Sequence, residues 1–272
     1  MSPDRLAMEW EGGRDAAREW RLKWELATNI LRREIKGRYS QTFLGFGWAL
    51  IQPVIMMVAF TLVFGRFAKV SSEGVPYPLF SYVGLVPWTF LASGIAAGTF
   101  SIAGYRSLIT RVYFPRIILP IAEVSTRLLD FFVAALLLAV LMVVYGIAPT
   151  LWILMVPVLL GIQFFLAVGI ALWTSAMYAF YRDVGPVVQL GLQVWLLLSP
   201  VAYPLSAVPD RHRFLYLLNP MSGLVEGYRS IIVFGRAPDF SALGIAVAVT
   251  AVVFLGGYMV FKGLDRYFAD FV

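Results

Sequence analysis

The chain has 272 residues, of which 60% are hydrophobic and 14% are charged. Soluble domains carry about 25% charged residues, so this composition excludes an ordinary soluble protein and predicts an integral membrane protein. The absence of cysteine and the single histidine exclude disulfides, thiol chemistry and Cys/His metal sites, so we predict no metal site. The net charge of +6 says little about nucleic-acid binding, because in a membrane protein the placement of Lys and Arg reports orientation.

Residues 1–42 are predicted to form a cytoplasmic tail followed by an amphipathic interfacial helix. From Trp20 on, apolar residues fall on one helical face and cations gather on the other. The apolar face holds Trp20, Trp24, Ala27, Leu31 and Ile35, and the basic face holds Arg18, Arg21, Arg32, Arg33 and Lys36. An apolar stripe backed by cations is typical of a helix at the lipid headgroups. The alternative, a surface helix of a soluble domain, is disfavoured because the chain offers no soluble domain for packing.

Residues 43–272 are predicted to form a six-span transmembrane domain of α-helices. The hydrocarbon core is about 30 Å thick and needs about 20 apolar residues per helix. The predicted spans are Phe43–Phe64, Pro78–Phe100, Ile121–Tyr145, Leu151–Phe180, Val187–Tyr203 and Leu243–Lys262. A kink or loosened turn is expected at Pro53 because proline removes a helical hydrogen bond. Gly94 and Gly98 form a GxxxG step that permits close helix contact.

Three connections are too polar or too short to cross. The first, about residues 101–118, carries Arg106, Arg111 and Arg116 and predicts one or two short interfacial helices broken at Pro115. The second, residues 181–186, is a tight polar turn. The third, residues 204–236, is predicted to be a re-entrant or interfacial helical hairpin on the outer side of the membrane. Within it, Asn219 should cap a helix that starts at Pro220 and stops before Gly235. That helix carries Glu226 and Arg229.

Three charges open the third predicted span. Glu123, Arg127 and Asp130 stand at i, i+4 and i+7 and so share one helical face. Charges at membrane depth are costly and are usually paired or functional. The favoured interpretation is an intramembrane ion ladder that orients the span, in which Glu123 precedes Arg127 in the favourable order. A contact to a partner subunit or to a substrate headgroup is the alternative.

The distribution of Lys and Arg predicts the orientation. An even number of spans puts both termini on one side. The terminal side holds fifteen cations: nine before Ser40, with Arg106, Arg111, Arg116, Arg182, Lys262 and Arg266. The opposite side holds six: Arg66, Lys69, Arg211, Arg213, Arg229 and Arg236. The excess predicts a multi-pass membrane protein with both termini in the cytoplasm.

The sequence contains none of three common nucleotide-binding or catalytic motifs. There is no G-x-x-x-x-G-K-[ST] loop to cradle ATP phosphates, no H-E-x-x-H and no G-x-S-x-G. Glu123 and Asp130 each have Arg127 nearby, and a neighbouring positive charge argues against the raised pKa that an acid–base role needs. We therefore predict a transport subunit without catalytic residues or a bound cofactor, rather than an enzyme.

Aromatic and amide side chains suggest a path for carbohydrate. The chain has 21 Phe, 13 Tyr and 8 Trp, and many of these will simply face lipid or the headgroups. The C–H faces of a sugar can stack on aromatic rings, and its hydroxyls can form hydrogen bonds with amide side chains. The dry interior of a bilayer offers no hydrogen-bond partners to these hydroxyls, so a polysaccharide needs a lined path. The candidate channel residues are Tyr39, Phe43, Trp48, Gln52, Gln189, Gln193, Trp195 and Tyr203.

Several stretches resemble the permease subunit of the polysaccharide ABC exporters, which move O-antigen, capsule or teichoic-acid polymers. They are EIKGRYSQTFLGFGWALIQPV, PYPLFSYVGLVPW, RVYFPRIILP, YRDVGP, and WLLLSPVAYPLSAVP followed by LLNPMSGLVEGYR. Each stretch is weak evidence alone, but together they run in the family's order from about Arg33 to Phe234.

The resemblance implies a homodimer that works with two separate ABC ATPase subunits, which bind ATP and Mg²⁺. It implies an undecaprenyl-diphosphate-linked polymer as substrate, spans one and five along a central path, and the bacterial inner membrane as location. The implied ATPase-docking residues are Tyr105, Arg106, Arg111, Arg116, Arg182 and Asp183, and the implied outer gate holds Asn219, Pro220, Glu226 and Arg229.

Two questions stay open at the level of sequence. The basic cluster Arg32, Arg33, Lys36 and Arg38 is a candidate site for the carrier-lipid diphosphate, but the same face suits an ATPase. The substrate is the second question. An ABC exporter of the same fold for a small or lipid molecule is the alternative to a polysaccharide exporter, and a membrane glycosyltransferase is the alternative from another class.

Overall fold

The computed structural model describes residues 47–109 and 114–268, and these residues are helical with no strand. The predicted interfacial helix, the basic cluster around Arg32, Tyr39, Phe43 and Arg111 lie outside the described residues. The elements in chain order are α2 (Gly47–Phe60), η1 (Thr61–Phe67), α3 (Tyr77–Gly104), α4 (Arg106–Ile109), α5 (Ile118–Val144), η2 (Leu151–Met155), α6 (Val156–Phe180), α7 (Val184–Leu198), η3 (Leu205–Ala207), α8 (Asp210–Leu218), α9 (Pro220–Ile232), α10 (Phe240–Leu264) and η4 (Asp265–Tyr267).

Five helical segments in the described part are long and apolar enough to cross a membrane. They are Leu50–Phe67, Tyr77–Gly104, Ile118–Val144, Leu151–Phe180 and Phe240–Tyr267. These segments correspond to the first four predicted spans and the sixth. Helix α7 stands where the fifth was predicted, but it has only 15 residues. At 1.5 Å per residue this is about 22 Å, shorter than a hydrocarbon core of about 30 Å.

Several helix ends in the structure differ from the ends predicted from the sequence. Helix α7 ends at Leu198 rather than at Tyr203, because a turn begins at Ser199 and Pro200 has no N–H to continue the helix. Helix α3 runs on to Gly104, four residues beyond its predicted end at Phe100. Helix α2 continues through Pro53, and the π-helix η1 follows it in the same span.

Helix α3 is the centre of the bundle. It packs against α2, α5, α6, α7 and α9, and most of its side chains are buried, whereas only a minority of the residues in each of the other four candidate spans is buried. Three helices have a proline in their first turn: Pro78 in α3, Pro157 in α6 and Pro220 in α9. Proline is favoured there because the first N–H groups of a helix have no partner in the helix.

Glycines let the helices approach closely. A Cβ atom added at Gly98 would lie 2.5 Å from the Ala171 Cβ, and one added at Gly94 would lie 3.5 Å from a Val124 methyl. The close contact predicted for the GxxxG step is thereby confirmed, with α6 and α5 as the neighbours. A second close contact joins α6 to α10, where a Cβ at Gly257 would lie 2.3 Å from the Gly169 carbonyl oxygen.

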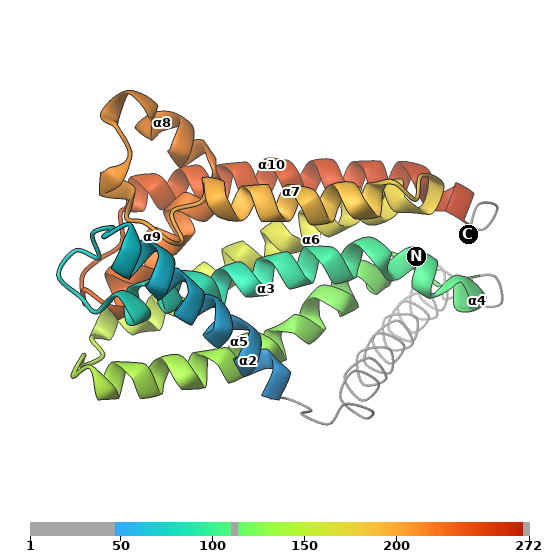
Figure 1. The fold of residues 1–272 in the computed structure, drawn as a ribbon. Coiled ribbons are helices and arrows are strands. Elements are labelled where there is room, and N and C mark those ends of the chain that lie inside the picture. The colour runs from blue at the N-terminus through green and yellow to red at the C-terminus, as the bar shows by residue number, and fades with distance from the viewer. Residues whose placement is uncertain (1–46, 110–113, 269–272) are drawn as a thin grey trace, which may run out of the picture.

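The two ends of the bundle carry different elements (Figure 1). One end carries α4, the turn between α6 and α7, and the end of α10. The other end carries α8, α9 and the loop that precedes α3. Helix α7 starts at the first end and finishes at the second, alongside α3 and α6. The bundle therefore separates the predicted docking segments from the predicted outer gate.

Candidate functional site

Helix α9 is the structural centre of the predicted outer gate. Every residue of α9 except Glu226 is buried, against α3, α6, α8 and α10. The predicted start of this helix is confirmed: the Asn219 side chain accepts a hydrogen bond from the Met221 N–H, and Pro220 is the first helical residue. Gly235 has a φ of +60°, as expected for the residue that stops the chain from continuing as a helix.

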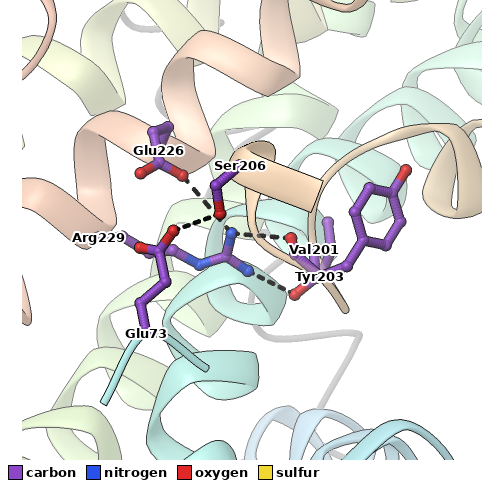
Figure 2. A network of polar contacts seen from close by, with 6 residues as sticks. All are labelled: Glu73, Val201, Tyr203, Ser206, Glu226 and Arg229. Carbon is purple, nitrogen blue, oxygen red and sulfur yellow. Dashed lines mark hydrogen bonds and ion pairs between the residues drawn. The ribbon is translucent and has the colours of Figure 1, made fainter. Parts of the chain in front are cut away.

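Arg229 of α9 is completely buried and ties three elements together (Figure 2). Its Nη2 donates to the Val201 carbonyl oxygen at 2.6 Å, and its Nη1 donates to the Tyr203 carbonyl oxygen at 3.2 Å. The guanidinium lies over the Phe80 ring of α3, 3.7 Å from the centroid. Because both carbonyls belong to the turns after α7, Arg229 fixes the end of α7 onto α9 and α3.

Two acidic residues surround this arginine. Glu226 Oε2 lies 3.7 Å from Arg229 Nη1, and Ser206 Oγ donates to Glu73 Oε1 at 2.7 Å (Figure 2). Burial raises the pKa of the Glu226 carboxyl above its usual value, while the charge on Arg229 lowers it. Burial also lowers the pKa of the Arg229 guanidinium, and Glu226 and Glu73 oppose this shift. The carboxylates thus stabilise a cation that burial would otherwise disfavour.

Asn219 joins α9 to the end of α7. Its Oδ1 accepts hydrogen bonds from the Met221 N–H at 3.1 Å and from Trp195 Nε1 at 2.9 Å. Its Nδ2 donates to Ser199 Oγ at 3.0 Å and to the Leu198 carbonyl oxygen at 3.4 Å. Trp195 also packs edge-on against Trp88 of α3. The cap residue is therefore a junction between α3, α7 and α9.

We expect Asn219→Ala to lower the free energy of unfolding by about 1–2 kcal/mol, the usual cost of losing a helix N-cap side chain. The measurement is thermal or denaturant unfolding of the detergent-purified protein. Asn219→Asp is the matched control, because it keeps the oxygen that caps α9 and loses the amide that donates to Ser199. Equal losses in the two variants would mean that capping is not the source of the effect.

A second polar chain joins α9 to α6 and α3. The Tyr228 hydroxyl donates to Gln163 Oε1 at 3.2 Å, and Gln163 Nε2 donates to the Pro87 carbonyl oxygen. All three groups are buried, so each one needs its partner. Tyr228 and Arg229 are neighbours in α9, and they anchor this helix to α6 and α3 from adjacent positions.

The predicted channel residues fall into two groups. Trp48, Gln52, Gln189 and Gln193 have exposed side chains. Trp195 and Tyr203 are partly buried and make contacts within the chain: the Tyr203 hydroxyl donates to the Leu197 carbonyl oxygen at 3.0 Å and lies 3.3 Å from the Tyr216 hydroxyl. Four of the six described channel residues are thus exposed, and the other two contact their own protomer; Tyr39 and Phe43 lie outside the described residues.

Gln52 and Asp130 line a shared small hollow of about 50 Å³ between α2, α3 and α5, together with Thr89 and Ser93. Asp130 is the last member of the predicted ion ladder. Glu123, Arg127 and Asp130 all lie in the first half of α5 and are partly buried. The hollow brings one predicted channel residue and one ladder residue to the same place.

The predicted docking residues that the structure describes lie at the end of the bundle opposite α9. Arg106, Arg182 and Asp183 are exposed, whereas Tyr105 is buried. The Arg182 guanidinium lies 5.0 Å from the centroid of the Tyr178 ring. Arg116 binds within the chain: Nη1 donates to the Asp265 carbonyl oxygen and lies 3.6 Å from its carboxylate. Arg116 thus links the start of α5 to the end of α10.

Comparison with known proteins assigns the family. The family model described as "ABC-2 type transporter" matches residues 26–233. The chain belongs to the ABC-2 type transporter family. The match covers the bundle from α2 to α9, with the Arg229 site included.

Named relatives of this transporter align over nearly their whole length. The O-antigen export system permease protein RfbA of Myxococcus xanthus is 32% identical over 248 residues, which cover 90% of this chain and 94% of the relative. An RfbA protein of Klebsiella pneumoniae is 24% identical, over 91% of this chain and 95% of the relative. The polysialic acid transport protein KpsM of Escherichia coli is 22% identical, over 86% and 91%.

Sequence reasoning missed several polar residues of this ABC-2 transporter. Glu73 and Ser206 join the outer network from two loops that are far apart in sequence, and no pattern pairs them. Gln163 did give a signal, because a glutamine amid the apolar residues of α6 must find a partner in the bundle. The sequence gave no such signal for Tyr228, because tyrosine is common near the membrane surface.

Proposed function

We propose that this chain is the channel-forming permease half of an ATP-driven exporter that carries polysaccharide from the cytoplasm across the inner membrane. The observation that carries the proposal is the 32% identity, over 90% of the chain, to a protein named as an O-antigen export permease. The sequence has no loop for ATP phosphates, so the energy must come from a separate ATPase. ATP and Mg²⁺ would then be bound by that partner.

The assembly we propose has two copies of the chain and two ABC ATPase subunits. Exposed amides of α7 support a paired arrangement. Gln189 and Gln193 lie one helical turn apart with exposed side chains, among exposed apolar residues such as Leu190 and Leu197. An amide facing lipid loses hydrogen bonds to water at a cost of about 1–3 kcal/mol. A second protomer and a water-filled path between the two copies would remove that cost.

The topology we propose has six crossings and both termini in the cytoplasm. Helix α7 is short, but it runs between the same two ends of the bundle as its neighbours (Figure 1). A short crossing is tolerated where it is packed against protein and the bilayer thins locally. Residues 1–42 would then lie on the inner surface, where Arg32, Arg33, Lys36 and Arg38 meet a carrier diphosphate or the ATPase. Residues 204–236 would cap the outer mouth.

The substrate we propose is a polymer still attached to its undecaprenyl-diphosphate carrier. Deleting the gene should leave polymer synthesis intact and strand the carrier-linked polymer inside the cell. The measurement compares surface polymer with polymer extracted in the lipid fraction of deleted and complemented cells. Loss of synthesis itself would favour a glycosyltransferase, and normal surface polymer would contradict the proposal.

We expect Arg182→Glu to lower the polymer-dependent ATPase activity of the assembled exporter about tenfold, because reversing an interface charge sets like charges against each other. Arg182 is exposed at the end that also carries α4. The measurement is ATP hydrolysis by the purified permease–ATPase complex in lipid nanodiscs.

The matched control is Arg211→Glu, an equal change of charge at an exposed residue of α8 at the opposite end of the bundle. Its ATPase activity should match that of the unmodified complex. The same activity in both variants would remove the turn between α6 and α7 from the ATPase interface.

A further inference from the structure

We infer that a polar hollow beneath α8 binds sugar units of the polymer as it leaves the exporter. This outer hollow has a volume of about 370 Å³ and is lined by Glu73, Ser206, Arg213, Glu226, Arg236 and Asp239. The inference rests on the proposed function, since it takes polysaccharide as the cargo. The hollow lies at the end of the bundle that carries α8 and α9 (Figure 1).

The size and position of the outer hollow suit a small part of a polymer. Ligand sites generally measure about 300–1,000 Å³, and the hollow falls in this range. Its walls come from the loop before α3, from η3, α8 and α9, from the loop of residues 236–239 and from the start of α10. Six separate segments thus converge on a space that none of their side chains fills.

The lining of the outer hollow matches the chemistry of a hydroxyl group. A sugar hydroxyl both donates and accepts a hydrogen bond. Arg213 and Arg236 supply donors, while Glu73, Glu226 and Asp239 supply acceptors. One acceptor is available: Glu226 Oε2 is buried and makes no hydrogen bond within the described residues, although Arg229 lies 3.7 Å away. A buried oxygen of this kind is stabilised by a ligand that donates to it.

Other ligand classes fit the outer hollow less well. A metal ion is disfavoured, because no group of three or more His, Cys, Asp or Glu side chains in the described part of the chain is placed to hold one. An anion is disfavoured, because three carboxylates line the space against two guanidinium groups. An apolar ligand is disfavoured, because Leu205 is the largest apolar residue of the lining.

The floor of the outer hollow is rigid. Glu226 stands on α9, which Arg229 ties to the turns after α7 and Tyr228 ties to α6. Its roof is α8, which carries Arg213. The acceptor Glu226 and the donor Arg213 are thereby held on different helices, so that a sugar unit between them would bridge α9 to α8.

Direct binding provides the test. The probes are fragments of three to five sugars cut from the surface polysaccharide of the host cell, and inorganic phosphate as an anionic comparison. Binding to the full-length permease in lipid nanodiscs is followed by saturation-transfer NMR. Ala237→Trp places a large side chain at the lining, whereas Ala207→Trp, at an exposed residue outside the lining, is its control. Arg213→Ala and Arg211→Ala form a second pair on the same helix.

We expect the sugar fragments to bind, Ala237→Trp to abolish binding, and Arg213→Ala to weaken it about tenfold, as expected for the loss of one charged hydrogen-bond donor. The two control variants should bind like the unmodified protein. Absence of binding, equal binding by Ala237→Trp, or displacement of the fragments by phosphate would each overturn the inference. The gene deletion tests the proposed function separately. If deletion strands the polymer inside the cell but the sugar fragments do not bind to the outer hollow, only the sugar site is refuted. If export is normal after deletion, the proposed function is refuted.

Discussion

Replacing Arg229 by leucine is expected to lower the free energy of unfolding by about 3–5 kcal/mol, the cost of breaking a buried ion pair by removing one partner. The carbonyl oxygens of Val201 and Tyr203 would lose their donors, and Glu226 would lose the charge beside it. Since Arg229 is fully buried, water cannot replace these contacts. The measurement is unfolding of the detergent-purified protein, with the amount in the membrane as a second readout.

Two variants separate the contacts of Arg229 from its size and charge. Arg229→Lys keeps the charge but lacks the planar guanidinium that reaches two carbonyls at once, so we expect an intermediate loss. Arg211→Leu makes the same change of residue type as Arg229→Leu at an exposed position of α8 and should change stability by less than about 0.5 kcal/mol. A loss below about 1 kcal/mol for Arg229→Leu would show that the outer network does not hold the turns after α7 in place.

Replacing Gly257 by alanine is expected to destabilise the protein by about 1–3 kcal/mol, the usual cost of overpacking a tight interface. The new Cβ would lie 2.3 Å from the Gly169 carbonyl oxygen and 2.7 Å from the Trp173 ring. The nearest of these atoms belongs to the backbone of α6, so relief requires α6 and α10 to move apart. Unfolding of the purified protein measures the effect.

Gly244→Ala is the matched control on α10. No atom lies within 4 Å of the Cβ that it would add, and alanine favours a helix over glycine by about 0.8–1.0 kcal/mol. We therefore expect the two variants to shift stability in opposite directions. If Gly257→Ala were as stable as Gly244→Ala, close packing of α6 on α10 would not be required for the fold.

The sequence predicted the main elements because each one depends on local chemistry. Runs of apolar residues about as long as a bilayer is thick identify five candidate spans, whatever they pack against. Asn219 and Pro220 marked the start of α9, since the N-cap bond joins an Asn side chain to an N–H two residues ahead. Gly94 and Gly98 marked a close contact, but they did not identify α5 and α6 as the neighbours.

The predicted site was less accessible from the sequence, because its geometry depends on long-range contacts. Arg229 was expected at an outer gate, and the charge pattern did not show that it is buried and bonded to carbonyls about 26–28 residues earlier. Tyr105 shared the polar segment of the docking residues, yet its ring is buried. The length of α7 was overestimated, since apolar residues continue past the turn at Ser199 that ends the helix.

The sequence by itself determined that this protein is a helical membrane protein without a phosphate-binding loop, since span length, composition and motifs are properties of contiguous residues. Only the tertiary structure decided which polar groups meet. Glu73 stands 133 residues before Ser206, and the fold brings both of them beside the Glu226–Arg229 pair of α9. Helical periodicity identifies the polar face of each segment, whereas the partner of that face depends on how the helices pack around α3.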